Sequence, residues 1–373
     1  MADDSAADAL AALRATMRAV WRLGSVVLVG WTSTGNGIEV LAVPVTRFFE
    51  QLHRHRRLMI GDRRMGRRTF DDVARKLDME PVEIRTSVPV GDQPGEIPLK
   101  DVEAAVTQFS MQHTDQRAVF LVDIVGFSLL APEQQALQLT TLEFAFNLAV
   151  ATAREQMRAP QLLRSTTGDG FYAWSSEKGP EADLSVLAIV VMTLTYLGCL
   201  RRLPESVGVP TVRCCFGIGS HYTYRQPGFD GISDIEFIVG QVTIQLARLI
   251  GVARPGQVLV GDFLRREADS SEALDAVAFL ARASERVGWL RGLPLPGSRV
   301  ERVSLYLTGA RAHDGFDVDA LVVVDKHGLS HRCFNMKVNV FLSDGDPFYC
   351  GLTHEELAEG KDRDEKQRAL AGP

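Results

Sequence analysis

Two aspartates, Asp123 and Asp169, are the residues of this sequence best suited to bind a divalent cation. Asp123 follows the apolar run 118–122, which has the composition of a buried strand, and Asp169 stands with Gly170 at the tip of an expected hairpin. If the two strands are neighbours in one sheet, both carboxylates converge on one point. Carboxylate pairs beside a phosphate bind Mg²⁺ or Mn²⁺ in phosphoryl chemistry. Taken alone, Asp169-Gly170 indicates only a turn.

The turn that follows the first aspartate is a candidate anion-binding site. The backbone N–H groups of Val125, Gly126, Phe127 and Ser128 come just beyond the expected end of the strand, before a helix-forming run. Backbone N–H groups in such turns bind anionic oxygens, as helix N-termini do. We therefore expect these residues to bind the phosphates of a nucleoside triphosphate next to the cation.

The apolar pattern around these residues indicates an α/β or α+β fold over a single sheet, because strands and helices alternate along the chain. Helices are expected at 132–158, 181–202 and 240–250. Strands are expected at 117–123, 162–167, 212–218, 257–260, 276–281 and 303–307. The run Leu184–Leu200 is uncharged but short and carries several polar residues, so we expect a buried helix rather than a membrane span.

The regions before and after this central region differ from it in their expected secondary structure. Before it we expect a helix at 5–22, strands at 25–31 and 38–43, and a helix at 45–57. After it we expect strands at 318–324 and 337–342, followed by a charged tail. The expected domains are therefore an N-terminal regulatory or dimer-supporting region at 1–114, a catalytic domain at 115–310 and a small β-rich domain with the tail at 311–373.

The composition favours a cytoplasmic protein that does not coat nucleic acid. The 373 residues are 46% hydrophobic and 24% charged, with a net charge of −6. Five cysteines without a framework spacing indicate reduced thiols, and the acidic start lacks a secretion signal. The seven arginines between Arg54 and Arg68 indicate a solvated surface or acidic partners within the fold; the alternative is a contact with phosphate or nucleic acid.

Several motifs in order along the chain resemble the class III nucleotidyl cyclases, the superfamily of adenylate and guanylate cyclases. The resemblance covers about residues 117–310 and implies a central, mostly antiparallel sheet flanked by helices. The residues that carry it are Phe120-x-x-Asp-Ile-x-Gly-Phe-Ser128, Thr166-x-Gly-Asp-Gly-Phe171, Gly217-Ile-Gly219, the segment Gly240–Leu249, Pro255–Val260 and Leu290-Arg-Gly292.

The resemblance implies that a 3′-hydroxyl attacks the α-phosphate of the same nucleotide and that pyrophosphate leaves. Asp123, Asp169 and the backbone carbonyl of Ile124 would bind two Mn²⁺ or Mg²⁺ ions. Arg248 would stabilise the transition state and Arg291 would bind the triphosphate; the alternative for each is a surface charge. The N–H groups of the turn would hold the β- and γ-phosphates. The family forms its sites between two such domains, so a homodimer with shared sites is implied.

The expected base pocket departs from the family. Ser165 stands where adenylate cyclases have Lys and guanylate cyclases have Glu, and Phe237 stands where adenylate cyclases have Asp. Ile244 replaces the ribose-positioning Asn, so Gln241 or Gln245 would take over that contact. Because both purine-reading groups are missing and Phe237 would narrow the pocket, we expect a pyrimidine base.

The segment from Val324 to Leu352 resembles the sensor-type domain found on bacterial pyrimidine cyclases of the Pycsar antiphage systems. The expected reaction is therefore UTP to cyclic UMP, read by a separate effector protein. Alternatives are a cytidylate cyclase, an adenylate cyclase and a catalytically silent nucleotide sensor. The histidines and cysteines of this segment are alternatively a metal site.

Overall fold

The computed structural model describes residues 2–359 except 23, 51–57, 59, 204–207, 228–233, 267–272, 296, 313–314 and 326. The chain forms two compact units, which are described separately. The first comprises 1–114 and 222–239, and the second comprises 115–221 and 240–373. One limit coincides with the expected boundary after residue 114. The described residues beyond 310, in contrast, belong to the same unit as the region expected to be catalytic.

The first unit is a small sheet with helices on both faces. Its sheet contains β1 (Val26–Thr34), β2 (Gly37–Pro44) and β3 (Val82–Arg85), all antiparallel. In addition, β8 (Asp234–Val239) pairs with the end of β7 (Val212–Pro227). Because strand side chains alternate between faces, Leu28 packs with α1 and α5, while Val27 and Val29 pack with α2 and α4. The helices are α1 (Ala2–Trp21), α2 (Val45–Glu50), α4 (Arg67–Leu77) and α5 (Leu99–Thr107).

Some of the clustered arginines have acidic partners within this unit. The Glu103 carboxylate accepts the backbone N–H groups of Arg63 at 2.5 Å and Arg64 at 2.9 Å. The Arg67 guanidinium pairs with Glu39 at 2.7 Å and with Asp71 at 3.1 Å. Of these contacts, those of Arg67 are made by the guanidinium and agree with acidic partners within the fold. Arg54, Arg56 and Arg57, with the end of the helix expected at 45–57, lie outside the described residues.

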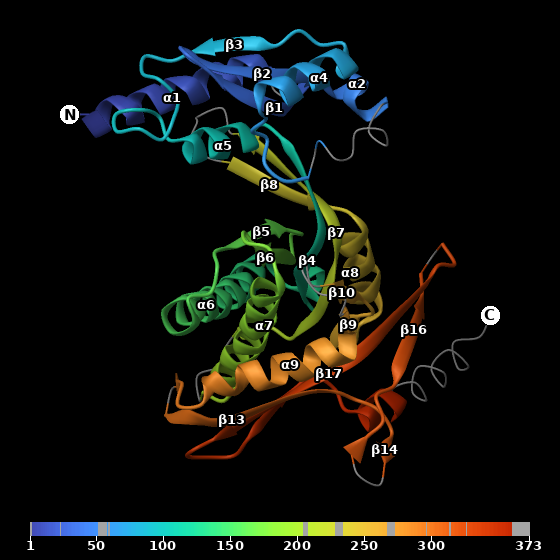
Figure 1. Cartoon of the computed structure of the whole chain (residues 1–373). Coiled ribbons are helices and arrows are strands. Elements are labelled where there is room, and N and C mark those ends of the chain that lie inside the picture. The colour runs from blue at the N-terminus through green and yellow to red at the C-terminus, as the bar shows by residue number, and fades with distance from the viewer. Residues whose placement is uncertain are drawn as a thin grey trace. The chain divides into compact units, whose positions relative to one another are not determined.

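The second unit is built on the central sheet, whose strand order is β12-β13-β17-β9-β7-β4-β6-β5 (Figure 1). The pairs with a recorded register are antiparallel except β7 with β9, so the expected mostly antiparallel sheet is confirmed. β16 (Ala320–Val324) and β18 (Phe348–Cys350) also pair with β17. The strands are β4 (Met111–Ile124), β5 (Leu162–Thr166), β6 (Gly170–Ser175), β7 (Val212–Pro227), β9 (Val258–Gly261), β12 (Pro294–Leu295), β13 (Ser298–Leu307) and β17 (Ser330–Leu342).

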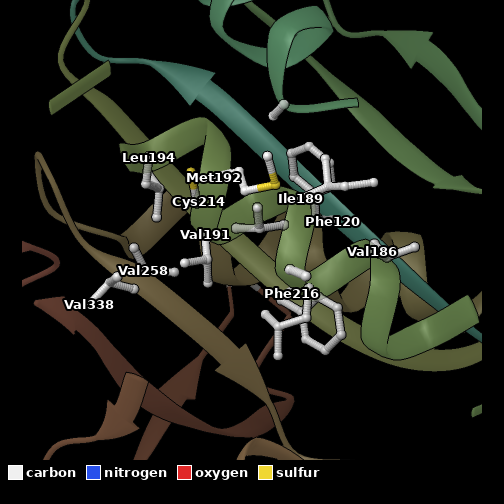
Figure 2. Packing of buried hydrophobic residues seen from close by; sticks show 14 of the residues in the cluster. Phe120, Val186, Ile189, Val191, Met192, Leu194, Cys214, Phe216, Val258 and Val338 are labelled. Carbon is white, nitrogen blue, oxygen red and sulfur yellow. The ribbon is translucent and has the colours of Figure 1, made fainter. Parts of the chain in front are cut away.

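Helices cover the two faces of this sheet unequally. α6 (Pro132–Met157), α7 (Pro180–Arg201) and α9 (Ala276–Arg286) pack on one face with Phe120, Phe216 and Val258, and Figure 2 shows part of this packing. In the described chain α7 is the one helix long and apolar enough to cross a membrane, and 89% of its most apolar window is buried. The expectation of a buried helix is confirmed.

The other face of the sheet is covered by α8 (Gln241–Val252), which packs on two glycines of β7. A Cβ at Gly217 would lie 3.3 Å from Leu246 Cδ2, and a Cβ at Gly219 would lie 3.1 Å from Val242 Cβ. The intervening Ile218 points to the α7 face. The Gly-Ile-Gly sequence therefore lets α8 approach the strand while the isoleucine fills the core.

One expected strand is wrong. Residues 276–281 begin α9, whose N-cap Asp275 accepts the N–H of Ala278 at 2.8 Å. The buried residues Ala276, Phe279, Leu280 and Ala283 have helical spacing. A six-residue apolar run does not distinguish a strand from the start of a helix, and the cap decides here. Two short strands, β10 (Leu264–Arg266) and β11 (Ala273–Asp275), pair just before it.

Candidate active site

The structure brings the two predicted metal-binding aspartates together. In the β4–β6 ladder Asp123 lies opposite Gly170, and the Ile124 N–H donates to the Asp169 carbonyl at 3.0 Å. A Cβ at Gly170 would lie 1.9 Å from the Val122 carbonyl oxygen, so only glycine allows this close approach. The hairpin tip is thereby fixed against the end of β4, with Asp169 beside Asp123.

Asp123 lies in an environment that disfavours its negative charge. Burial raises the pKa of its carboxyl group, Arg213 opposes that shift, and the neighbouring Asp169 adds to it. The Arg213 Nε donates to Asp123 Oδ2 at 2.6 Å. Arg213, on β7, was not among the predicted site residues. Because side chains alternate along β7, the sequence could have placed Arg213 on the same face of the strand as Gly217. The sequence does not show, however, that β7 lies next to β4, the strand that carries Asp123.

The turn after β4 has the form of a small anion nest. Gly126 has φ +70°, a left-handed conformation that favours glycine, and the short 3₁₀ helix η2 (Phe127–Leu129) follows it. The N–H groups of Gly126, Phe127 and Ser128 are not paired with a backbone carbonyl among the described residues. The Val125 N–H, in contrast, donates to the Thr211 carbonyl at 2.9 Å. The candidate triphosphate cradle is therefore the last three residues, without the Val125 amide.

These residues suit a hard divalent cation held jointly with a nucleotide. The described residues contain no group of three or more His, Cys, Asp or Glu side chains able to hold a metal. Two adjacent carboxylates and a nearby phosphate cradle fit Mg²⁺ or Mn²⁺, which are commonly bound by one or two carboxylates together with substrate phosphates. A cation there would also offset the burial, and the smaller repulsion from Asp169, that raise the Asp123 pKa. Among the described residues, the histidines and cysteines of the C-terminal segment form no such group either.

Arg248 lies on α8 and pairs with a residue of the C-terminal segment. Val242, Leu246 and Leu249 are buried beneath the helix, while Ile244 is 55% exposed, as the spacing predicts. The Arg248 Nε lies 3.2 Å from Asp325 Oδ2. Asp325 was not predicted as a site residue, because 77 positions separate it from its partner and no local pattern marks it.

Tyr172 links two of the predicted base-pocket elements of the second unit, the strand that carries Ser165 and the start of α8. Ser165 lies opposite Tyr172 in the β5–β6 ladder, and the Tyr172 hydroxyl donates to the Thr243 carbonyl in the first turn of α8 at 3.2 Å. Gln241 is exposed at the start of α8. Gln245 instead donates to the Asp262 carbonyl at 3.4 Å. Gln241 is thus the better candidate of the two glutamines for a ribose contact.

Two other predicted site residues are not joined to the aspartates by any contact that the structure records. Phe237 belongs to the first unit, where it is 41% exposed and stacks on Tyr224 with ring centroids 6.5 Å apart. Arg291 is exposed just before β12, and four strands separate β12 from β4 in the sheet. Within one chain, the roles of Phe237 and Arg291 at the site remain predictions.

Comparison with known proteins gives matches only among solved structures. No protein-family model matches the sequence, and neither does any curated protein. The chain is similar to a guanylate cyclase domain from Catenaria anguillulae crystallised with GTP, at 10% identity and a TM-score of 0.37, over 62% of this chain and 100% of that one. The adenylyl cyclase CyaB from P. aeruginosa aligns at 16% identity and a TM-score of 0.32, over 44% and 93%.

A further similar structure is a dimeric guanylyl cyclase domain from Blastocladiella emersonii, at 11% identity and a TM-score of 0.35, over 60% of this chain and 97% of that one. Because these identities and TM-scores are low, we base the functional argument on the site itself.

Proposed function

We propose that the chain is a nucleotide cyclase that converts UTP to 3′,5′-cyclic UMP and pyrophosphate. The observation that carries the proposal is the juxtaposition of Asp123 and Asp169 at the end of β4, beside the N–H groups of 126–128. Carboxylates and an anion nest at one sheet edge are the parts that a metal-bound triphosphate requires.

In this mechanism the 3′-oxygen bonds to the α-phosphorus, the bond from that phosphorus to the β-phosphate bridge breaks, and pyrophosphate and the hydroxyl proton leave. The backbone N–H groups of Gly126, Phe127 and Ser128 orient the β- and γ-phosphates. Asp123, Asp169 and the Ile124 carbonyl would hold two Mn²⁺ or Mg²⁺ ions, and bound ions would make the hydroxyl more acidic and offset triphosphate charge. Arg248 adds positive charge at the transition state, and Arg291 binds the triphosphate.

The proposed preference for a pyrimidine depends on the residues near the start of α8. Ser165 and Tyr172 offer hydroxyl groups rather than the charged side chains of purine cyclases. Phe237 belongs to the first unit and is assigned to the pocket by its position in the sequence alone, where an aromatic ring would limit the size of the base. Nothing in these side chains separates a 4-oxo from a 4-amino group, so CTP is the second candidate substrate. The proposed biological role is that of a cytoplasmic homodimeric signal generator in antiphage defence, with a separate effector that binds the cyclic nucleotide.

The test is turnover of ATP, GTP, CTP and UTP by the purified chain with Mn²⁺. The products are separated by chromatography and identified by mass spectrometry. We expect cyclic UMP as the main product and a loss of at least about 100-fold in kcat for Asp169→Asn, because one metal ligand is removed. Asp344→Asn, an exposed carboxylate after β17, is the matched control. A cyclic purine product contradicts the base assignment, and no product with any triphosphate contradicts the enzyme.

A further inference from the structure

The turn between β16 and β17 contains a carboxylate, Asp325, that is held by hydrogen bonds from the turn itself. Asp325 Oδ1 accepts the backbone N–H groups of His327 at 2.8 Å and Leu329 at 3.0 Å. Its Oδ2 lies 3.2 Å from His331 Nε2, and the side chain is only 3% exposed. Hydrogen bonds from its own turn therefore fix the position and orientation of this carboxylate.

The group that this carboxylate meets is the proposed transition-state arginine. Arg248 Nε is 3.2 Å from Asp325 Oδ2, and this nitrogen is buried although 30% of the Arg248 side chain is exposed. A buried N–H donor without an acceptor is costly. The Nε makes no hydrogen bond within the described part of the chain, so Asp325 offsets this cost through the charge of an ion pair, whose recorded approach is at Nε, the nitrogen nearest the chain.

We propose that Asp325 is a positioning residue that holds Arg248 by its Nε and leaves the terminal nitrogens for the substrate's phosphates. This inference rests on the proposed function, because it assigns a task to Arg248 in that reaction. An arginine carries many rotamers, and holding one end of the guanidinium removes most of them before substrate binds. The C-terminal segment, whose role the sequence leaves open, thereby contributes to catalysis through one ion pair.

The structure favours positioning over an inhibitory latch. Asp325 and Arg248 belong to the same compact unit, and α8 packs against both β16 and β17. A latch would have to engage the phosphate-binding end of the guanidinium, whereas the recorded contact is at Nε. Burial opposes ionisation of Asp325, but the turn N–H groups, His331 and Arg248 outweigh it and lower its pKa to about 2. The ion pair is therefore present throughout the physiological pH range.

The first test is steady-state kinetics of Asp325→Asn with the triphosphate that the wild-type chain turns over best and Mn²⁺. We expect kcat to fall about 10- to 100-fold with KM changed less than about threefold, because a misplaced charge affects the transition state more than ground-state binding. Asp325→Glu, which keeps the charge, is expected to recover part of kcat. Asp319→Asn is the matched control. That carboxylate lies in the same segment, accepts the Ala310 N–H at 3.1 Å and pairs with His354.

The second test asks whether Asp325 acts through Arg248. In an Arg248→Lys background the Nε is absent, so Asp325→Asn is expected to change kcat little there. An equal loss in both backgrounds overturns the proposal, since it would show a general structural effect. A rise in kcat for Asp325→Asn in the wild-type background also overturns it, because the contact would then be inhibitory.

A third measurement separates this proposal from the proposed function. Phenylglyoxal labelling of Arg248, followed by mass spectrometry, is expected to be faster in Asp325→Asn than in the wild-type chain or Asp319→Asn. An unchanged labelling rate overturns the ion pair whatever the enzyme does. If the wild-type chain turns over none of the four triphosphates, the proposed function and the positioning role both fail, while the labelling rate still reports on the contact itself.

Discussion

Asp123 and Asp325 each lie next to an arginine, yet their surroundings shift their pKa values in opposite directions. At Asp123 burial and the neighbouring Asp169 raise the pKa despite Arg213. At Asp325 the hydrogen bonds of the turn, with His331 and Arg248, lower it to about 2 despite burial. The first carboxylate therefore gains from a further cation, whereas the second is already satisfied. This difference supports binding of a metal at one and a fixed structural contact at the other.

The low pKa of Asp325 predicts a pH-dependent contribution to stability. A carboxyl group whose pKa is about 2 in the folded chain and 3.8 ordinarily stabilises the fold above pH 3.8 and loses that contribution as the pH falls towards 2. Asp325→Asn is therefore expected to lower the free energy of unfolding at pH 7, with a difference from wild type that narrows below about pH 4. Urea unfolding at several pH values checks this. A difference that stays constant with pH would contradict it, and Asp319→Asn again serves as the control.

At the scale of the element, α8 can lie close to β7 because two positions on the facing side of that strand are glycines. Gly217 and Gly219 leave room for Leu246 and Val242, so the apolar face of the helix lies directly on the strand. The opposite face carries Ile244, and Arg248 reaches Asp325 from the helix. The position of the proposed catalytic arginine therefore depends on two glycines that make no contact with substrate.

Gly219→Val is expected to displace α8, because its Cβ would already lie 3.1 Å from Val242 Cβ. Overpacking of this kind costs about 1–3 kcal/mol of stability. We expect kcat to fall by more than this destabilisation explains at a temperature where the variant is folded, since Arg248 moves with the helix. Gly251→Ala is the control, because a Cβ there meets nothing within 4 Å. Calorimetry and kcat measured on both variants make the comparison, and equal activity would contradict the role given to the glycines.

The sequence predicts the elements of this site better than it predicts the connections between them. The hairpin at Asp169, the helix beneath Arg248 and the strand ending at Asp123 follow from periodicity and turn chemistry. The contacts of Arg213 with Asp123 and of Arg248 with Asp325 depend on which strands are neighbours. The strand expected at 276–281 was wrong for a different reason, because a short apolar run does not distinguish a strand from the start of a helix.

At the scale of the whole molecule, we propose that the site is shared between two chains. In the described contacts of a single chain, Arg248 pairs with Asp325 and Asp123 pairs with Arg213, and none joins Arg248 or Arg291 to the two aspartates. The resemblance to class III cyclases implies that a second copy brings its Arg248 to the aspartates of the first. Exposed Ile244, on the same helix, is available for such a contact.

Mixing two inactive variants, Asp169→Ala and Arg248→Ala, tests this arrangement. If the subunits exchange freely and the sites are shared, half of the dimers contain both variants, and each of these has one intact site. The expected recovery is therefore about a quarter of wild-type activity per chain, a value set by two-fold symmetry alone. A mixture of Asp169→Ala with the Asp169→Ala, Arg248→Ala double variant has no intact site in any dimer and should stay inactive. Sedimentation confirms that the mixed chains are dimeric; dimers without recovered activity would place Asp169 and Arg248 in the same chain's site.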